Sequence, residues 1–461
     1  MTIRSERAVV SGDLARLVEG EAIEGAARRP HKAMLYAAIQ VAGAGVSLGS
    51  WMVLGLVASA AYQQPAIQAY AISSVAALPL TLGIAYVLPN LFRGAASRER
   101  GGPWSAHIVA AWIVAAAGVG CGGILVLAAQ RGGTDRLAIG LGLTAGGFAA
   151  ASILGAQVAR ITERPGLMAV SACGQAVLPI TWCLAFLAGT NAERGALITL
   201  AVALAGLAVL VAACRRLTPR MTPRPLRRGF MLQAVVLIPH LVLFGILMQG
   251  LRAASAGMTP SDLLASHQVM LAVTAALTLG GSLHAIFTVR VQAADTPQIH
   301  DVIRSNARGY ALTGGTIGLA LVAGTMVGPL VLPGFPRLGP LGLIAVAAIV
   351  PGVMMYYAAS GLALRWGQAW IVTTSSVCAV AVFAATQIAG HAGALESRLL
   401  LYALAVLVLP VVCAGLVAIV GRGRSADGSV RAVVRWGCAS LVCTVGVVAG
   451  GALLIRQVHH G

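Results

Sequence analysis

Thirteen apolar runs, each about as long as a membrane is thick, dominate this chain. They cover approximately residues 34–60, 67–92, 104–129, 137–158, 168–189, 196–213, 230–253, 263–289, 309–331, 339–363, 369–389, 398–420 and 432–454. Only 10% of the residues are charged, whereas a soluble domain carries about 25%. A helix of roughly 20 apolar residues crosses the hydrocarbon layer and satisfies its own backbone there. The sequence therefore predicts an all-α, polytopic transmembrane bundle of about 13 spans.

The two halves of the chain resemble each other. Leu80-Thr81-Leu82-Gly83 recurs as Leu277-Thr278-Leu279-Gly280, 197 positions later, and the same shift places Arg93 on Arg290. We expect two parallel six-helix repeats plus one extra C-terminal helix, as in transporters built from repeats. The expected parts are an N-terminal tail (1–33), an N-lobe (34–213), a basic linker (214–229), a C-lobe (230–420), and a loop with the extra helix (421–461).

The distribution of arginine predicts the orientation. With the N-terminus inside and the spans alternating, nineteen arginines fall in inside connections and seven in outside ones. Six of the nineteen lie in the linker: Arg215, Arg216, Arg220, Arg224, Arg227 and Arg228. Because cytoplasmic loops carry the excess of basic residues, we expect a cytoplasmic N-terminus, tail and linker. Lys32 is the only lysine, and Ala and Gly are abundant, which is typical of a GC-rich bacterium and hence of its plasma (inner) membrane.

The net charge of +18 is explained by this topology, so no nucleic-acid partner is expected. The eight cysteines are scattered without a CxxC pair, so a metal or redox role is not expected. Gly118-Val119-Gly120-Cys121-Gly122-Gly123 matches G-x-G-x-x-G, but it lies inside an apolar run without a preceding strand. We therefore expect no nucleotide site, no metal and no cofactor.

All fourteen acidic residues fall in tails or loops and none falls in mid-span. Proton and sodium pathways usually depend on a carboxylate within the membrane. Membrane-embedded hydrolases and glycosyltransferases need acids or metal ligands at the reacting atoms. The sequence thus weakens both a simple ion-coupled antiport mechanism and an enzymatic function, and no catalytic residues are expected.

Polar side chains do occur within the spans, at helical spacing on repeat-related helices. Seven-residue steps place such residues on one helix face, and exposing them to lipid is costly. We expect them to line a substrate cavity between the lobes, with interhelical hydrogen bonding as the alternative. The candidates are Gln40, Ser47, Gln233, His240, His267, Thr274 and Thr278.

Arg93 and Arg290 end the second and eighth spans on the inner side. Guanidinium groups bind phosphate oxygens bidentately, so these two arginines are candidates for contact with an anionic headgroup. A purely topological role is the alternative. The six linker arginines are candidates for contact with anionic lipid, with plain cytosolic exposure as the other interpretation.

Several short segments resemble a known superfamily, the multidrug/oligosaccharidyl-lipid/polysaccharide exporters. Gly155-Ala156-Gln157-Val158-Ala159-Arg160 and Ser360-Gly361-Leu362-Ala363-Leu364-Arg365 are similar to its polysaccharide flippase branch. Ala265-Ser266-His267-Gln268 and Thr288-Val289-Arg290-Val291 are similar to its multidrug and toxin extrusion (MATE) branch. The likeness covers roughly residues 34–420. Thirteen spans depart from the twelve or fourteen that are common in the family.

The resemblance implies a transporter that moves an amphipathic, lipid-linked saccharide outward through the bilayer by alternating access between two lobes. A MATE-type multidrug or small-metabolite antiporter is the first alternative. A non-transporting membrane scaffold of an envelope assembly complex is the second. Short outer loops without paired acids disfavour a glycosyltransferase or polymerase.

Overall fold

The structure, a computed structural model, consists of helices and their connections. It describes residues 34–36, 38–54, 58–84, 106–130, 134–161, 164–217, 228–252, 259–293, 299–331, 335–389, 395–421 and 427–460. Within these ranges every regular element is helical. The predicted all-α class is therefore confirmed.

Thirteen of the described helices are at least 18 residues long. Twelve of them are apolar enough to cross a membrane, and the thirteenth, α2, carries Gln63, Gln64 and Gln68. The order is a first span (Met34–Leu54), α2 (Ala60–Ala77), η1 (Pro79–Thr81), α5 (Ala106–Ala129), α6 (Thr134–Ile161), α7 (Pro165–Leu187), α8 (Ala192–Leu217), α9 (Arg228–Gln249), η2 (Gly250–Arg252), α10 (Pro260–Ala293), α11 (Ile299–Val331), α12 (Pro340–Arg365), α13 (Ala369–Ala389), α14 (Leu395–Gly421) and α15 (Asp427–His460).

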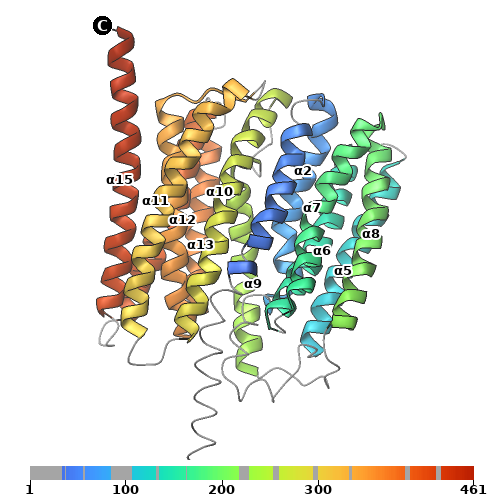
Figure 1. The fold of residues 1–461 in the computed structure, drawn as a ribbon, viewed down its shortest axis with the longest axis horizontal. Helices are drawn as coiled ribbons and strands as arrows, with labels where there is room; N and C mark the ends of the chain where they lie inside the picture. Colours follow the sequence, from blue (N-terminus) through green and yellow to red (C-terminus); the bar gives the residue numbers. More distant parts are fainter. Residues whose placement is uncertain are drawn as a thin grey trace, which may run out of the picture.

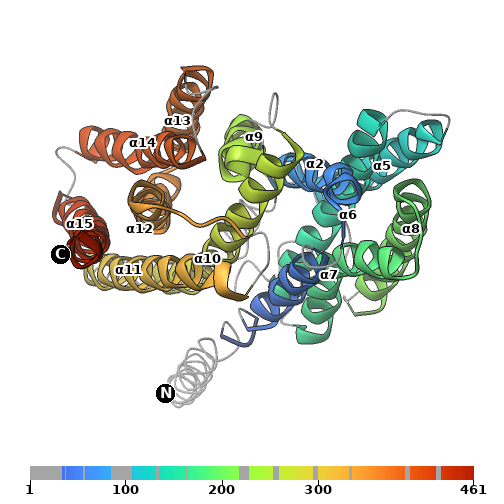
Figure 2. The same ribbon diagram turned by 90° about the horizontal axis from the view of Figure 1, so that it is seen from above.

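The helices stand side by side in two groups (Figures 1 and 2). The first span, α2 and α5–α8 form one group, called the N-lobe here, and α9–α15 form the other, the C-lobe. Each group has its own apolar core: the C-lobe core is built from residues between Ala234 and Val448, and the N-lobe cores lie between Tyr36 and Cys214. Leu271 of the C-lobe is the exception, because it packs into an N-lobe core with Trp51 and Leu54.

Helices α2 and α9 run antiparallel and join the two lobes. A Cβ atom added to Gly245 would lie 3.1 Å from the Cα of Val75, and one added to Gly83 would lie 2.3 Å from the carbonyl oxygen of Ala234. The end of the molecule at which α8 ends and α9 begins is called the linker end; the opposite end, at η2, is the far end. The α2–α9 contact thus reaches from Gly83 at the linker end to η2 at the far end.

The repeated motif adopts two different conformations. In the N-lobe, α2 ends at Ala77, η1 follows, and Leu82 and Gly83 have φ angles of 54° and 70°. In the C-lobe, Leu277–Gly280 lies inside α10. Pro79 precedes the first copy, whereas the repeat-related position is Ala276. Proline lacks a backbone N–H and clashes with the preceding turn, which contributes to the break, but α9, α12 and α14 continue through their own internal prolines. The expected span 67–92 is thus interrupted after Ala77 within the part that the structure describes.

The glycine-rich stretch 118–123 has a packing role. A Cβ atom on Gly122 would lie 2.4 Å from the backbone nitrogen of Thr144, and one on Gly147 would lie 2.5 Å from the carbonyl oxygen of Ala115. Small residues let two membrane helices approach closely. Gly118 and Gly122 therefore let α5 pack directly against α6, while Gly123 faces Leu200 of α8.

The extra helix α15 belongs to the C-lobe side. Ser440 Oγ donates a 2.6 Å hydrogen bond to the carbonyl of Ala311 in α11, and the guanidinium of Arg308 lies 5.9 Å from the ring centre of Trp436. Figure 1 shows α15 standing at the edge of the bundle beside α11. It packs on the surface formed by α11 and α12.

Candidate functional site

A second contact between the lobes joins the first span to α10 near the far end. The rings of Trp51 and His267 meet edge to face with centroids 5.1 Å apart, and Tyr70 of α2 lies 6.1 Å from the same imidazole. Both ring nitrogens of His267 are buried, and neither has a hydrogen-bond partner among the described residues. The His267 imidazole is therefore packed between aromatic rings and makes no hydrogen bond with the described residues.

Arg252 lies beside this contact and is only 2% exposed. Its guanidinium donates to Gln249 Oε1 at 3.3 Å, to Thr274 Oγ1 at 3.4 Å and to the carbonyl of His267 at 3.2 Å. The guanidinium carbon also stands 4.9 Å from the ring centre of Tyr70, on the other lobe. Each of these contacts with the described residues is thus to a neutral group.

Among the described residues, no acidic side chain pairs with Arg252. Asp301, for comparison, pairs with Arg304. Burying a charge costs several kcal/mol. A desolvated cation–π contact returns about 2 kcal/mol, and hydrogen bonds near 3.3 Å are longer than the usual 2.9–3.0 Å. The site stabilises the cation in part and leaves it able to accept an anion.

Tyr402 of α14 completes the arrangement from the C-lobe side. Its hydroxyl is buried and has no hydrogen-bond partner in the described chain, and its ring approaches the backbone of η2 at Gly250. Gly250 has a φ angle of 50°, which lets η2 turn so that Arg252 points into the protein. We call Trp51, Tyr70, Arg252, His267 and Tyr402 the interlobe cluster.

The contact between the first span and α10 is tight only toward the far end. Six consecutive residues of α10, from Ser266 to Leu271, are all buried, so this part of the helix is covered on every side. Closer to the linker end, Thr274 and Thr278 are half-buried and Leu279 is 40% exposed. The first span follows the same trend, with Trp51 and Leu54 buried and Val46 51% exposed.

The predicted cavity residues are distributed over two environments. Gln40 and Ser47 on the first span and Thr274 and Thr278 on α10 are half-buried and lie on helices that face each other between the lobes. Thr274 also bonds to Arg252. His267 belongs to the interlobe cluster. These five residues lie on the two helices that form the partly open contact.

His240 lies elsewhere, inside the C-lobe. Its Nδ1 is 2.7 Å from Ser376 Oγ and 3.4 Å from the hydroxyl of Tyr356, and its ring is 3% exposed. Phe244, one turn along α9, stacks on Tyr356. The helical stripe of α9 that carries His240 therefore faces α13 and α12 at this point.

Three predicted positions fall partly or wholly outside the described residues. Arg93 lies in the range 85–105, which the structure does not describe. Gln233 and Arg290 lie in α9 and α10, but their side chains are outside the description. Among the described residues no group of three His, Cys, Asp or Glu side chains could hold a metal ion.

Sequence reasoning missed Arg252 as a site residue. Arg252 is one of the seven arginines that the predicted topology places in outside connections, because it ends an apolar run as the topological arginines do. One signal was present: Gln249 and Gly250 precede Arg252 by three and two residues. A polar amide side chain next to a conformationally free glycine is unusual at the end of a span. The packing of α2 and α10 around Arg252 depends on the tertiary structure, so the sequence alone does not reveal it.

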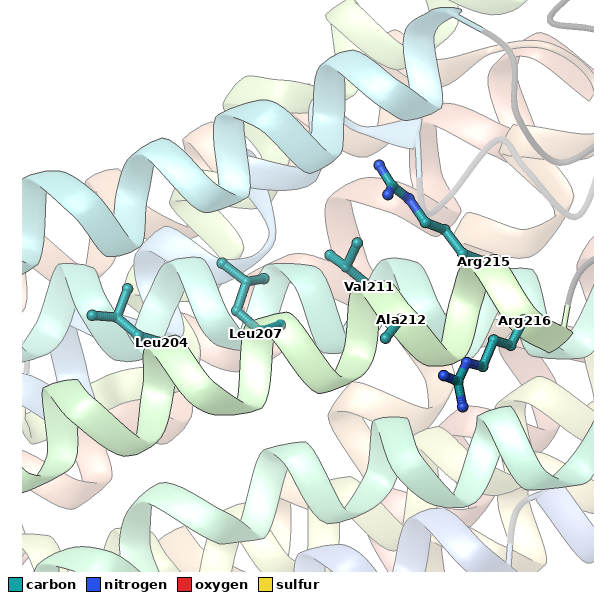
Figure 3. Close-up of a pocket in the computed structure, with 7 residues that line it drawn as sticks. Leu204, Leu207, Val211, Ala212, Arg215 and Arg216 are labelled. Carbon is teal, nitrogen blue, oxygen red and sulfur yellow. The ribbon is translucent and has the colours of Figure 1, made fainter.

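A groove on α8 contains two of the linker arginines (Figure 3). It has a volume of ≈ 560 Å³ and is lined by Leu204, Leu207, Ala208, Val211, Ala212, Arg215 and Arg216. The apolar residues follow one another along the helix, and the two guanidinium groups stand at its end (Figure 3). The groove thus combines an apolar stripe with a basic end.

Comparison with known proteins gives one informative result. No family model matches the chain, and no curated protein matches it. Among solved structures, the crystal structure of the eukaryotic MATE transporter AtDTX14 superposes with a TM-score of 0.51 at 15% sequence identity, covering 89% of this chain and 99% of that one. The chain therefore has the fold of a MATE transporter, as the MATE branch of the superfamily resemblance implies.

Proposed function

We propose that this protein is a membrane transporter that exports an amphipathic, lipid-linked saccharide by alternating access between the N-lobe and the C-lobe. The observation that supports the proposal is the pair of contacts between the lobes. The α2–α9 contact is close over the stretch marked by Gly83 and Gly245, whereas the contact between the first span and α10 is tight only at the far end. Two lobes that stay in contact on one side can rotate about that contact and open a substrate path on the other side.

The proposed orientation places the linker end, the N-terminal tail and the linker 214–229 in the cytoplasm of a bacterial plasma membrane. The substrate would then enter from the cytoplasmic side, where Thr278 and Leu279 are accessible. Arg93 and Arg290 are proposed as the first contacts of an anionic headgroup at that side. Joint replacement of the two by Gln would slow flipping if they act in this way.

The polarity of the spans supports an anionic substrate. The chain has no acidic residue in mid-span, while a buried arginine stands between the lobes. A cationic drug would find no counter-charge in the membrane interior. A MATE-type multidrug or small-metabolite antiporter is the second candidate, and the fold shared with AtDTX14 favours it.

A flipping assay in proteoliposomes tests the proposal. We expect the purified protein to move a fluorescent polyprenyl-diphosphate saccharide between leaflets, and to leave efflux of a cationic dye at the background rate. Dye efflux without flipping would favour the antiporter. Neither activity, in either orientation, would favour a non-transporting scaffold.

A disulfide across the partly open contact tests the rocking. In a variant without the eight native cysteines, Gln40→Cys and Thr278→Cys place a pair on the facing helices. Oxidation should stop flipping, and reduction should restore it. A pair within the C-lobe, Ser440→Cys with Ala311→Cys, is the control and should leave the rate unchanged. Equal rates with the first pair oxidised would contradict alternating access at this contact.

The groove on α8 is proposed to hold an anionic lipid, with its acyl chain on Leu204, Leu207 and Val211 and its headgroup on Arg215 and Arg216. A basic cluster at a membrane surface attracts anionic lipid by about 1 kcal/mol per residue. Replacing both arginines by Gln should reduce retention of phosphatidylglycerol over phosphatidylcholine, as measured by native mass spectrometry. Arg194→Gln, at the other end of α8, is the control.

A further inference from the structure

The interlobe cluster has the properties of a ligand site that is closed. Arg252 is buried and contacts only neutral oxygens and the ring of Tyr70. The Tyr402 hydroxyl and both nitrogens of His267 are buried without hydrogen bonds to described residues. Buried polar groups are nearly always satisfied, and Arg252 Nε also lacks a hydrogen-bond partner among the described residues, so the cluster points to a group that is absent from this conformation.

The chemistry of the cluster selects an oxyanion. A guanidinium binds phosphate with paired, charge-assisted hydrogen bonds, and a hydroxyl or a protonated ring nitrogen is a further donor to the same oxygens. A neutral saccharide would leave the charge uncompensated. A phosphate or diphosphate group, either on a lipid carrier or free in solution, has the oxygen acceptors that the Arg252 guanidinium and the Tyr402 hydroxyl lack.

The position of the cluster links binding to movement of the lobes. Arg252, His267 and Tyr402 belong to the C-lobe. Tyr70, which lies over Arg252, and Trp51, which lies against His267, belong to the N-lobe. Separation of the lobes at the far end would remove Tyr70 from the guanidinium and leave the cation unmatched. An anion that arrives at that moment replaces the aromatic ring.

We propose that Arg252 receives the phosphate group of the transported molecule at the far end of the path, and that this group exchanges with Tyr70 when the lobes separate. The Tyr402 hydroxyl and the His267 ring supply additional hydrogen bonds. The inference rests on the proposed transport function for the movement of the lobes, but binding itself can be measured without transport.

Binding is measured first, on purified full-length protein in detergent, with inorganic diphosphate as the probe and calorimetry as the readout. One charge-assisted contact contributes roughly a factor of 10 to 100 in affinity. We expect Arg252→Gln to weaken binding by at least about tenfold and Tyr402→Phe to weaken it several-fold. Arg136→Gln, an exposed arginine at the same end of the molecule, should bind as the unmodified protein does.

Gel filtration shows whether each variant is folded. If Arg252→Gln does not fold, Tyr402→Phe still tests the inference, since it removes only one oxygen atom. Equal affinities for the unmodified protein, Arg252→Gln and Tyr402→Phe would overturn the inference. If only the phenylalanine variant folds, unchanged affinity in that variant has the same consequence.

A second experiment distinguishes a free from a lipid-linked phosphate, and it also distinguishes failure of this site from failure of the proposed transport function. Vesicles of phosphatidylcholine with a fluorescent polyprenyl diphosphate replace the inorganic probe. Dependence on Arg252 in both probes assigns the site to the diphosphate itself; dependence in vesicles alone assigns it to the lipid-linked form. Arg252-dependent binding without flipping supports this site and contradicts the proposed function. Flipping that is equal in Arg252→Gln and the unmodified protein supports the function and contradicts this site.

Discussion

Gly83→Ala is the substitution for which the structure gives the clearest expected effect. Gly83 has a φ angle of 70°, in the left-handed region, where an L-residue with a side chain costs about 1–2 kcal/mol. The added Cβ would also lie 2.3 Å from the carbonyl oxygen of Ala234 and 3.0 Å from its carbon. Both are backbone atoms of α9, so no side-chain rotation relieves the contact, and overpacking costs about 1–3 kcal/mol.

The two terms give a destabilisation of about 2–5 kcal/mol. A unit of 150–250 residues, the size of one lobe, loses about 2–4 °C in melting temperature per kcal/mol. We therefore expect the apparent melting temperature, followed by fluorescence-detected gel filtration after heating, to fall by at least roughly 4 °C. Because the contact crosses between the lobes, the variant should also separate α2 from α9 at the linker end.

The repeat supplies a matched control. Gly280 occupies the position related to Gly83 but lies inside α10, and its added Cβ would meet the terminal Sδ of Met354 at 2.8 Å. That flexible side chain can move, and Ala in a helix is favoured over Gly by about 0.5–1 kcal/mol. Gly280→Ala should thus leave the melting temperature nearly unchanged. An unchanged temperature for Gly83→Ala, or a larger fall for Gly280→Ala, would refute the reasoning.

Two further substitutions and one truncation have defined outcomes. Gly250→Ala places a Cβ 2.9 Å from the ring of Tyr402 at a φ of 50°; it should lower the melting temperature and weaken diphosphate binding, as measured by calorimetry. Ser376→Ala removes the 2.7 Å partner of His240, which should cost about 1–3 kcal/mol in heat stability without changing diphosphate affinity. Removal of α15 should expose the surface of α11 and α12 and produce aggregation in gel filtration; a monodisperse truncated protein would contradict its packing role.

The number and type of elements could be predicted from the sequence, because a run of roughly 20 apolar residues in a membrane has one stable backbone solution. The repeated motif shows where such prediction stops. Leu80–Gly83 and Leu277–Gly280 have the same letters, but Pro79 ends α2 before the first copy while α10 continues through the second. Because α9, α12 and α14 continue through their internal prolines, the surroundings of the motif, and not its letters, set its conformation.

The candidate site was predictable only in part. Helical spacing identifies the face on which His267 and Thr274 lie, but spacing does not reveal what that face contacts. His240 satisfied the same criterion and bonds to Ser376 inside the C-lobe. Arg252 was hidden for the opposite reason, since an arginine at the end of a span is indistinguishable by position from one that sets topology. Only its 2% exposure identifies it.

The proposed polarity has an electrical consequence. If the linker end faces the cytoplasm, an anionic substrate leaves a compartment that is electrically negative, and each elementary charge that crosses gains about 2.3 kcal/mol per 100 mV. Export of an anion therefore needs no carboxylate that binds and releases protons, which agrees with the absence of acids from the mid-span positions of the sequence. A potassium diffusion potential across proteoliposomes should accelerate outward flipping of the diphosphate lipid when the lumen corresponding to the cytoplasm is negative, and slow it when the sign is reversed. Indifference to the sign would mean that the phosphate charge is compensated during transport, and acceleration by a proton gradient alone would place the coupling on a titrating group instead of on the potential.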